Sequence, residues 1–362
     1  MTAVSRKYSS VFLFTLSAIA FLLYASFNFV DSPDEYTNDY DLVEKQRGVH
    51  VFGRIDSTNL NAFQDDNIEW ITLVSWGFQK DVDSPEVSHG ASDSNRVERH
   101  NMHWCESIER VRNAGFKVFF KPHLWVHEPT EGKWRSDIFP NTDEDWESWK
   151  SSYTDFILRY AKVAEDAGAE MYCLGTEFTR LTTEKPEYWR YLIQEVRKVY
   201  SGKLTYAANW YQEYERVTFW DYLDYIGIQA YFPLTKKQEP KVNDLVHGWS
   251  EYLPRMEAIQ KKYDKQILFT EMGYKSTADA AIKPWEWAED PSRSDALPSN
   301  ETQVNCYAAF FESVWPNDWF GGVHVWQMRG DYGAIDRNYL ELDFSPQGKP
   351  AANTIRQGFH QN

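Results

Sequence analysis

Cysteine is rare in this sequence, whose 362 residues include only Cys105, Cys173 and Cys306. The set is odd in number and contains no Cys-x-x-Cys pair, so it is not a disulfide framework. One long-range bridge stays open, but buried free thiols are the commoner explanation of such a set. We therefore expect a fold that does not depend on its cysteines.

Positive charge and glycine-rich motifs are also scarce. Lysine and arginine number 38 against 54 acidic residues, which gives a formal net charge of −16. No run of Lys and Arg has the length of a nucleic-acid-binding patch, and an acidic surface repels phosphate backbones. No Gly-x-Gly-x-x-Gly, P-loop or Gly-x-Ser-x-Gly motif occurs. The sequence predicts no nucleic-acid partner and no cofactor. It favours a neutral ligand, although a local basic patch could still bind an anionic one.

A long apolar run lies near the N-terminus. Val11–Val30 is an uncharged run of 20 residues, long enough to span a bilayer. Basic residues precede it and acidic residues follow it, which predicts a cytoplasmic N-terminus and a periplasmic or extracellular remainder. The alternative is a cleaved signal peptide and a secreted protein. We favour an uncleaved transmembrane signal anchor, because the apolar region of a signal peptide is usually shorter. The predicted parts are a cytoplasmic tip and anchor over 1–31, an acidic linker over 32–45 and one globular domain over 46–360.

After the linker, short apolar runs alternate with longer amphipathic segments. Most of the short runs are almost continuously apolar, as in parallel strands that are covered on both faces. Eight strand–helix units in one series favour a closed (β/α)8 TIM barrel over an open doubly wound sheet. The predicted strands are Gly48–Phe52, Trp70–Ser75, Lys117–Leu124, Glu170–Gly175, Leu204–Ala208, Tyr225–Tyr231, Gln266–Thr270 and Gly322–Gln327. The predicted helices are His103–Ala114, Asp143–Ala167, Glu184–Tyr200, Trp249–Tyr263 and Glu301–Val314, with Val217–Asp224 a short helix at best.

Several connections that leave the predicted strands are long and rich in aromatic and polar residues. In a barrel these connections lie on the C-terminal face, where active sites are built. Aromatic residues make up 17% of the chain, including 16 Trp and 22 Tyr, and their flat apolar faces suit stacking on sugars. The long connections are Gly77–Met102, Trp125–Thr142, Phe232–Gly248, Lys275–Asn300 and Arg329–Lys349.

Two predicted strands end in a glutamate, a residue that is depleted in strands. Glu177 ends the fourth strand and Glu271 ends the seventh. Strands four and seven stand three apart on a ring of eight, so their ends face each other across the mouth. Glycoside cleavage uses two carboxylates, about 5 Å apart for retention or more than about 6.5 Å apart for inversion. The pair therefore predicts glycoside hydrolysis, against the alternative that each glutamate is a solvated strand end or half of a surface ion pair.

Other strand ends carry polar and aromatic side chains, the pattern of a sugar cleft. A phenol at Tyr231 could hydrogen-bond the nucleophile and hold it ionised, and an indole at Trp326 could form the floor of a sugar subsite. For each residue alone, packing in the core or at the rim is the alternative. The predicted substrate contacts at strand ends are Trp76, His123, Trp125, Asn209, Trp210, Tyr231 and Trp326.

The histidines do not form a metal motif. His123 and His127 are four residues apart but lie at a strand end, so this spacing does not place them on one face. A barrel metallohydrolase is expected to carry His-x-His on its first strand, where this chain has only His50. The sequence therefore predicts no metal site, with a metal-dependent barrel hydrolase as the alternative.

The motifs around both glutamates resemble those of the clan A glycoside hydrolases. Within that clan, Leu174–Phe178 (LGTEF) and Phe269–Tyr274 (FTEMGY) are most similar to glycoside hydrolase family 113. Lys121–His123 (KPH) adds to the likeness, which extends from about Arg47 to Phe359.

The resemblance implies a retaining mechanism. Glu177 would protonate the glycosidic oxygen and later activate water, and Glu271 would attack the anomeric carbon. β-1,4-Mannan or manno-oligosaccharides would be the first substrates to test. Many clan members carry an asparagine before the acid/base, whose amide binds the substrate 2-hydroxyl. Here the position is Thr176, a further expected substrate contact whose hydroxyl reaches less far.

A glycan-binding protein without activity, held at the membrane on the same scaffold, is the alternative function. It would keep the aromatic ring of the cleft and lose one carboxylate, whereas both are present here. We expect a membrane-anchored retaining hydrolase of neutral β-1,4-linked oligo- or polysaccharides, with endo and exo action both open.

Overall fold

The structure is a computed structural model, and it describes residues 44–55, 57–88, 94–287, 297–331 and 342–360. Residues Glu44–Asn362 form one compact unit. The predicted anchor Val11–Val30 and most of the predicted linker lie outside the described residues, so both stay predictions from the sequence. Within the described ranges, no helix is both long enough and apolar enough to cross a membrane.

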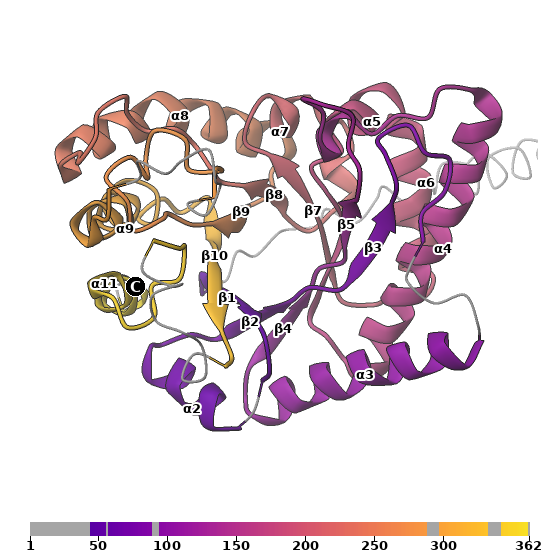
Figure 1. Ribbon diagram of the computed structural model, residues 1–362, viewed down its shortest axis with the longest axis horizontal. Coiled ribbons are helices and arrows are strands. Elements are labelled where there is room, and N and C mark those ends of the chain that lie inside the picture. Colours follow the sequence, from indigo (N-terminus) through magenta and orange to yellow (C-terminus); the bar gives the residue numbers. More distant parts are fainter. Residues whose placement is uncertain (1–43, 56, 89–93, 288–296, 332–341, 361–362) are drawn as a thin grey trace, which may run out of the picture. The chain divides into compact units, whose positions relative to one another are not determined.

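Parallel strands close into a barrel of eight (Figure 1), in the ring order β1, β2, β4, β6, β7, β8, β9, β10. The ring order follows the chain order, and this confirms the predicted (β/α)8 barrel. Each predicted strand overlaps one strand of the ring. The strands are β1 (Gln46–Phe52), β2 (Trp70–Leu73), β4 (Lys117–Phe120), β6 (Met171–Thr176), β7 (Lys203–Asn209), β8 (Ile226–Gln229), β9 (Ile267–Met272) and β10 (Phe320–Arg329).

The barrel strands are buried on both faces, which explains their apolar runs. Inward-facing side chains, among them Phe119, Met171 and Leu268, form a small core of their own. A much larger core fills the space between the strands and the surrounding helices. The three cysteines are free, with Cys173 and Cys306 fully buried, as the sequence predicts.

The second and third predicted strands are shorter in the barrel than expected, because the chain leaves the ring and forms further strands. β3 (Trp76–Gln79) and β5 (His123–Val126) pair in parallel as a separate two-stranded sheet. Backbone bonds from Lys121 to Leu73 and from His123 to Ser75 connect the barrel to this sheet. Pro122, which has no N–H to donate, lies at the break between β4 and β5. The small sheet therefore raises one side of the barrel mouth.

Helices lie outside the strands (Figure 1) and cover the barrel. α4 (Asp143–Ala167) has the predicted bounds: Thr142 caps its first turn and Gly168, at a φ of 74°, ends it. The predicted helix over 184–200 is interrupted at Lys185, where α5 (Thr179–Glu184) ends and Pro186 opens α6 (Pro186–Arg197). The other helices are α2 (Ser57–Asp65), α3 (Ser94–Asn113), α7 (Glu213–Arg216), α8 (Val242–Tyr263), α9 (Asn300–Ser313) and α11 (Pro350–Phe359), with 3-10 turns η1 (Arg135–Asp137) and η2 (Trp220–Tyr222).

Candidate active site

A cleft of about 1040 Å³ opens where the barrel strands end. Both strand-end glutamates, Glu177 and Glu271, line it. Of the substrate contacts expected from the sequence, Trp76, His123, Trp125, Asn209, Trp210, Tyr231 and Trp326 also line it. The cleft therefore combines the two strand-end carboxylates with a wall of aromatic rings.

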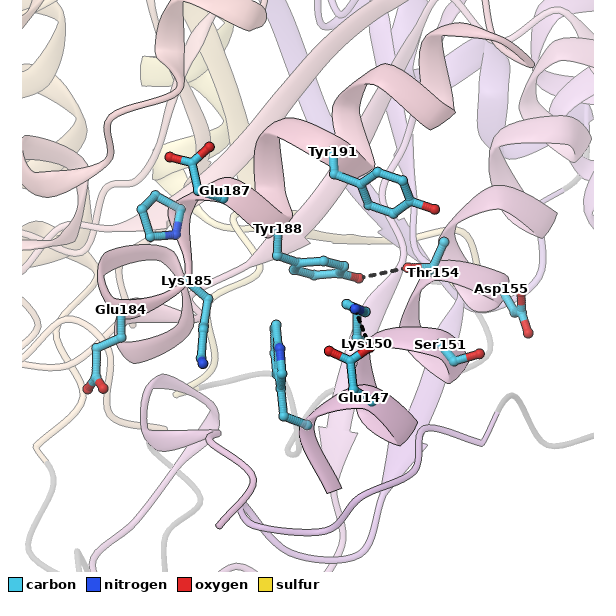
Figure 2. Close-up of a pocket in the computed structure, with 12 residues that line it drawn as sticks. Glu147, Lys150, Ser151, Thr154, Asp155, Glu184, Lys185, Glu187, Tyr188 and Tyr191 are labelled. Atoms are coloured by element: carbon cyan, nitrogen blue, oxygen red, sulfur yellow. Dashed lines mark hydrogen bonds and ion pairs between the residues drawn. The ribbon is translucent and has the colours of Figure 1, made fainter. Parts of the chain in front are cut away.

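A second hollow, of about 740 Å³, lies between α4 and the helices α5 and α6. Figure 2 shows Tyr188 bonded to Thr154 and Glu147 beside Lys150 in this hollow. Glu184 borders both the hollow and the cleft, but neither strand-end glutamate reaches the hollow. We therefore place the chemistry in the cleft.

Glu271 lies in β9 and is held by buried hydrogen-bond donors. The Lys121 ammonium lies 2.5 Å from its Oε1, and the Tyr231 hydroxyl donates to its Oε2 over 2.9 Å. The remaining Lys121 bonds go to Gln229 Oε1 (2.9 Å) and the Thr270 carbonyl (3.4 Å). All of Lys121's donors are thus directed at fixed acceptors, and Glu271 has a defined orientation.

The charge around Glu271 favours its ionised form. Burial acts to raise its pKa, but the Lys121 charge and the hydrogen bonds that Glu271 accepts outweigh burial, and the net pKa is lowered. The Tyr231 phenol has a pKa well above its usual value because of burial and the Glu271 charge, so it stays protonated and donates. This is the environment that a nucleophilic carboxylate needs.

His123 is a neutral partner of Glu271. Burial, and then the Lys121 charge, hold the pKa of His123 well below its usual value. The Arg135 guanidinium lies 3.4 Å from Nδ1 of His123, so Nδ1 is the acceptor and Nε2 carries the proton. Nε2 lies 3.4 Å from Oε1 of Glu271, which places a fixed dipole beside the carboxylate.

Glu177 follows β6 in an unusual backbone conformation. Its φ is 58°, in the left-handed region, where a residue other than glycine pays on the order of 1–3 kcal/mol. Its N–H donates to the Ala207 carbonyl over 2.9 Å. The Asn209 amide donates to its Oε1 over 3.4 Å, and Arg135 lies 3.8 Å from its Oε2. The turn directs the Glu177 carboxyl into the cleft.

The environment of Glu177 favours the protonated form, opposite to that of Glu271. Burial raises its pKa, Arg135 acts against burial, and the negative charge of Glu271 raises the pKa again, so that the net direction is upward. The two carboxyls therefore differ in the way that a proton donor and a nucleophile must differ. Arg135 and His123 lie between them and contact one carboxyl each.

Aromatic rings line both flanks of the cleft. On one flank, Trp125 packs edge-to-face against Trp76 and Trp134. On the other, Trp210 stacks on Trp285 with ring centroids 5.3 Å apart. Trp326, in β10, lies on the cleft surface between the flanks, 6.4 Å from and nearly parallel to the His123 ring. Flat rings on both flanks are suited to the apolar faces of several sugar units.

The structure does not place Thr176 in the cleft. Its side chain is buried, it does not line the cleft, and within the described residues its hydroxyl has no hydrogen-bond partner. The expected contact between Thr176 and a substrate hydroxyl is therefore corrected. The amide beside Glu177 comes instead from Asn209 at the end of β7.

Several site residues were not among the catalytic residues and substrate contacts expected from the sequence. Lys121 had a usable signal, because a lysine at the end of an apolar strand is as unusual as a glutamate there. Arg135 lies in the 3-10 turn η1, and Trp285 and Trp287 lie in an irregular segment, so no periodic pattern marks them.

His127, paired with His123 in the metal alternative, stacks instead on Phe78. Across the described ranges, no group of three His, Cys, Asp or Glu residues could hold a metal ion.

Comparison with known proteins gives one family. The family model of Glycoside Hydrolase Family 113 matches residues 46–349. A similar solved structure is a complex of a family 113 β-1,4-mannanase, 27% identical, with a TM-score of 0.73 over 88% of this chain and 100% of that one. The family 113 β-mannanase from Alicyclobacillus acidocaldarius, in complex with ManMIm, is 25% identical, with a TM-score of 0.72 over 87% and 97% of the two chains.

More distant similarity extends to a β-glucuronidase from Faecalibacterium prausnitzii. It is 11% identical, with a TM-score of 0.55 over 87% of this chain and 48% of that one, and the likeness is one of fold alone. Among curated proteins, no match to the chain was found.

Proposed function

We propose that this chain, which belongs to glycoside hydrolase family 113, is a retaining hydrolase of β-1,4-mannan or manno-oligosaccharides. In this proposal Glu177 is the acid/base and Glu271 is the nucleophile. The observation that carries it is the opposite environment of the two carboxyls: Lys121 and Tyr231 bind an ionised Glu271, whereas burial favours a protonated Glu177. The substrate is proposed from the family 113 mannanases that the chain resembles.

The proposed reaction has two displacements. Glu271 attacks the anomeric carbon while Glu177 gives its proton to the leaving glycosidic oxygen, and a covalent glycosyl-enzyme forms. Glu177, now ionised, takes a proton from water, which attacks the same carbon from the side of the departed group and releases Glu271. Two inversions leave the product with the configuration of the substrate. His123 and Arg135 stay in place between the carboxyls throughout.

Aromatic rings on both flanks of the cleft favour endo cleavage. Trp125 and Trp134 lie on one flank, and Trp210 and Trp285 on the other. A chain that crosses the mouth can therefore contact rings on either side of the carboxyls. The proposed position outside the cytoplasm depends only on the predicted anchor Val11–Val30 and stays a prediction.

Purified protein should hydrolyse β-1,4-mannan and manno-oligosaccharides faster than matched gluco- and xylo-oligosaccharides. Products followed by NMR should first appear as the β-anomer, because double displacement retains configuration. An α-anomer formed first would indicate inversion. If no glycan is cleaved but one is bound, the chain is a glycan-binding protein and the hydrolase proposal is wrong.

Replacing Lys121 by methionine should move the acid limb of the kcat/KM–pH profile to higher pH. The lysine charge is the first favourable interaction that lowers the pKa of Glu271, so its loss raises that pKa, and the nucleophile is protonated at a higher pH than in wild type. At the acid end of the profile we expect kcat/KM to fall about 100-fold.

The matched control is Lys203→Met, which removes an exposed lysine paired with Asp224 at the start of β7, where the chain enters the barrel. It should leave both limbs of the profile in place. An acid limb that is the same in Lys121→Met and wild type would show that Lys121 does not control the ionisation of Glu271.

A further inference from the structure

One buried carboxyl next to the cleft has no part in the two displacements. Glu213 opens the short helix α7, four residues after β7 ends at Asn209, and its side chain is fully buried. No lysine, arginine or histidine forms an ion pair with it in the part of the chain that the structure describes. A buried carboxyl without a cation needs other partners.

Glu213 finds those partners on the segments that carry Glu177 and Asn209. Its Oε2 accepts the Asn209 N–H over 2.7 Å and the Thr179 hydroxyl over 3.2 Å. Its Oε1 accepts the Thr182 hydroxyl over 2.8 Å and the Tyr206 hydroxyl over 2.7 Å. The four donors come from α5 and β7, so one carboxyl on α7 connects three segments around the cleft.

The segment after Glu177 depends on these bonds. The Phe178 N–H donates to the Tyr206 hydroxyl over 2.6 Å, and this hydroxyl in turn donates to Glu213. Phe178 is the N-cap of α5 and gives that helix no side-chain capping bond. A left-handed residue such as Glu177 persists only where its surroundings fix it. Phe178, the residue that follows Glu177, is connected to Glu213 through the Tyr206 hydroxyl.

We propose that Glu213 is a positioning residue for the acid/base. Its carboxyl holds the turn that directs Glu177 into the cleft and, through the backbone of Asn209, holds the amide that contacts Glu177. The inference rests on the proposed function, because it requires that Glu177 donates the proton.

The charge of Glu177 also acts on Glu213. The titratable groups that face Glu213 are Glu177 and the Tyr206 phenol. Burial raises the pKa of Glu213 to about 7, against the hydrogen bonds that it accepts, and repulsion from Glu177 acts in the same direction as burial. The charge that raises the pKa of Glu213 is that of an ionised Glu177, so Glu177 loses its proton first. The pKa of Glu177 itself is shifted by burial, Arg135, Glu271 and Lys121, and Glu213 acts on Glu177 through geometry.

Glutamine at position 213 tests the positioning role. One end of the glutamine would be an NH₂ group facing either the Asn209 N–H or the Tyr206 hydroxyl. The N–H cannot accept a hydrogen bond, and the hydroxyl already accepts one from Phe178. Glu213→Gln therefore disturbs at least one support, and it also removes the negative charge.

The experiment compares two β-mannosides in the full-length protein. One is a manno-oligosaccharide, whose leaving group needs the proton of Glu177, and the other is a dinitrophenyl β-mannobioside, whose leaving group does not. We expect Glu213→Gln to lower kcat about 100-fold on the oligosaccharide. On the aryl substrate, the rate of the glycosylation step should fall only a few-fold.

Tyr206→Phe removes only the bridge to Phe178 and should show the same preference between substrates with a smaller loss. If Glu213→Gln does not fold, Tyr206→Phe still tests the positioning role. The control is Tyr200→Phe, which loses a buried bond to the Ala169 carbonyl before β6, at the opposite end of the barrel, and should affect neither substrate. Equal losses on both substrates would overturn the positioning role. A wild type that cleaves no β-mannoside would instead overturn the proposed function, and this inference with it.

Discussion

Replacing Glu271 by alanine should lower kcat on manno-oligosaccharides about 10⁵-fold, equivalent to roughly 7 kcal/mol of activation free energy. No other carboxylate described in the cleft is bound by both a lysine and a tyrosine, so none can replace it at the anomeric carbon. Turnover of a manno-oligosaccharide, followed by product chromatography, measures the loss directly.

Small anions should partly restore activity to Glu271→Ala. Azide or formate can enter beside Lys121 and Tyr231, where the carboxylate has been removed, and attack the sugar once. Azide should therefore give an α-mannosyl product, inverted relative to the substrate. Glu187→Ala, which removes an exposed partner of Arg190 on α6, is the matched control and should keep wild-type activity. Activity of Glu271→Ala within tenfold of wild type would mean that the nucleophile lies elsewhere.

The second large effect is expected at Glu177, and its size should depend on the leaving group. Glu177→Ala should lower kcat on manno-oligosaccharides about 10³-fold, because general acid catalysis is lost. A dinitrophenyl glycoside needs no proton, so the glycosyl-enzyme should form and then accumulate for lack of a general base. Intact-protein mass spectrometry would detect the added sugar mass on Glu271.

The pH profile gives an independent test of Glu177. The acid/base is active while protonated, and its pKa is raised by burial, so its ionisation sets the alkaline limb in wild type. That limb should disappear in Glu177→Ala, whereas the acid limb, set by Glu271, should remain. Azide should restore turnover with a β-product, since it attacks the glycosyl-enzyme from the side that Glu177 faces. A uniform loss on both kinds of substrate would contradict the assignment.

The sequence predicts the barrel because its strands are buried on both faces, and burial leaves almost continuous apolar runs. It does not predict the break between β4 and β5, because the residues on both sides of Lys121 and Pro122 are equally apolar. The start of α3 at Ser94 was missed for the opposite reason. The helix begins with polar residues, and its fully buried side chains, Ile108 and Val111, come late.

The two glutamates could be found from the sequence because a carboxylate at the end of an apolar strand is a local and unusual feature. The role of Glu213 could not, because its partners Thr179, Thr182 and Tyr206 meet it only when β6 and β7 lie side by side. Thr176 misled because its expected contact came from the family pattern, in which the residue before the acid/base reaches the substrate, and not from the local structure of this chain. A register shift between Cys173 and Thr176 and the left-handed turn at Glu177 decide instead which side chain reaches the mouth.

The small sheet of β3 and β5 has a thermodynamic consequence for ligand binding. Trp76 and Trp125 stand on paired strands, at positions whose backbones are fixed by the ladder before any sugar arrives. A platform that is already ordered loses little conformational entropy when a ligand stacks on it. On this flank of the cleft, most of the contact energy therefore remains available as affinity, and the sugar rather than the protein carries the entropic cost of association.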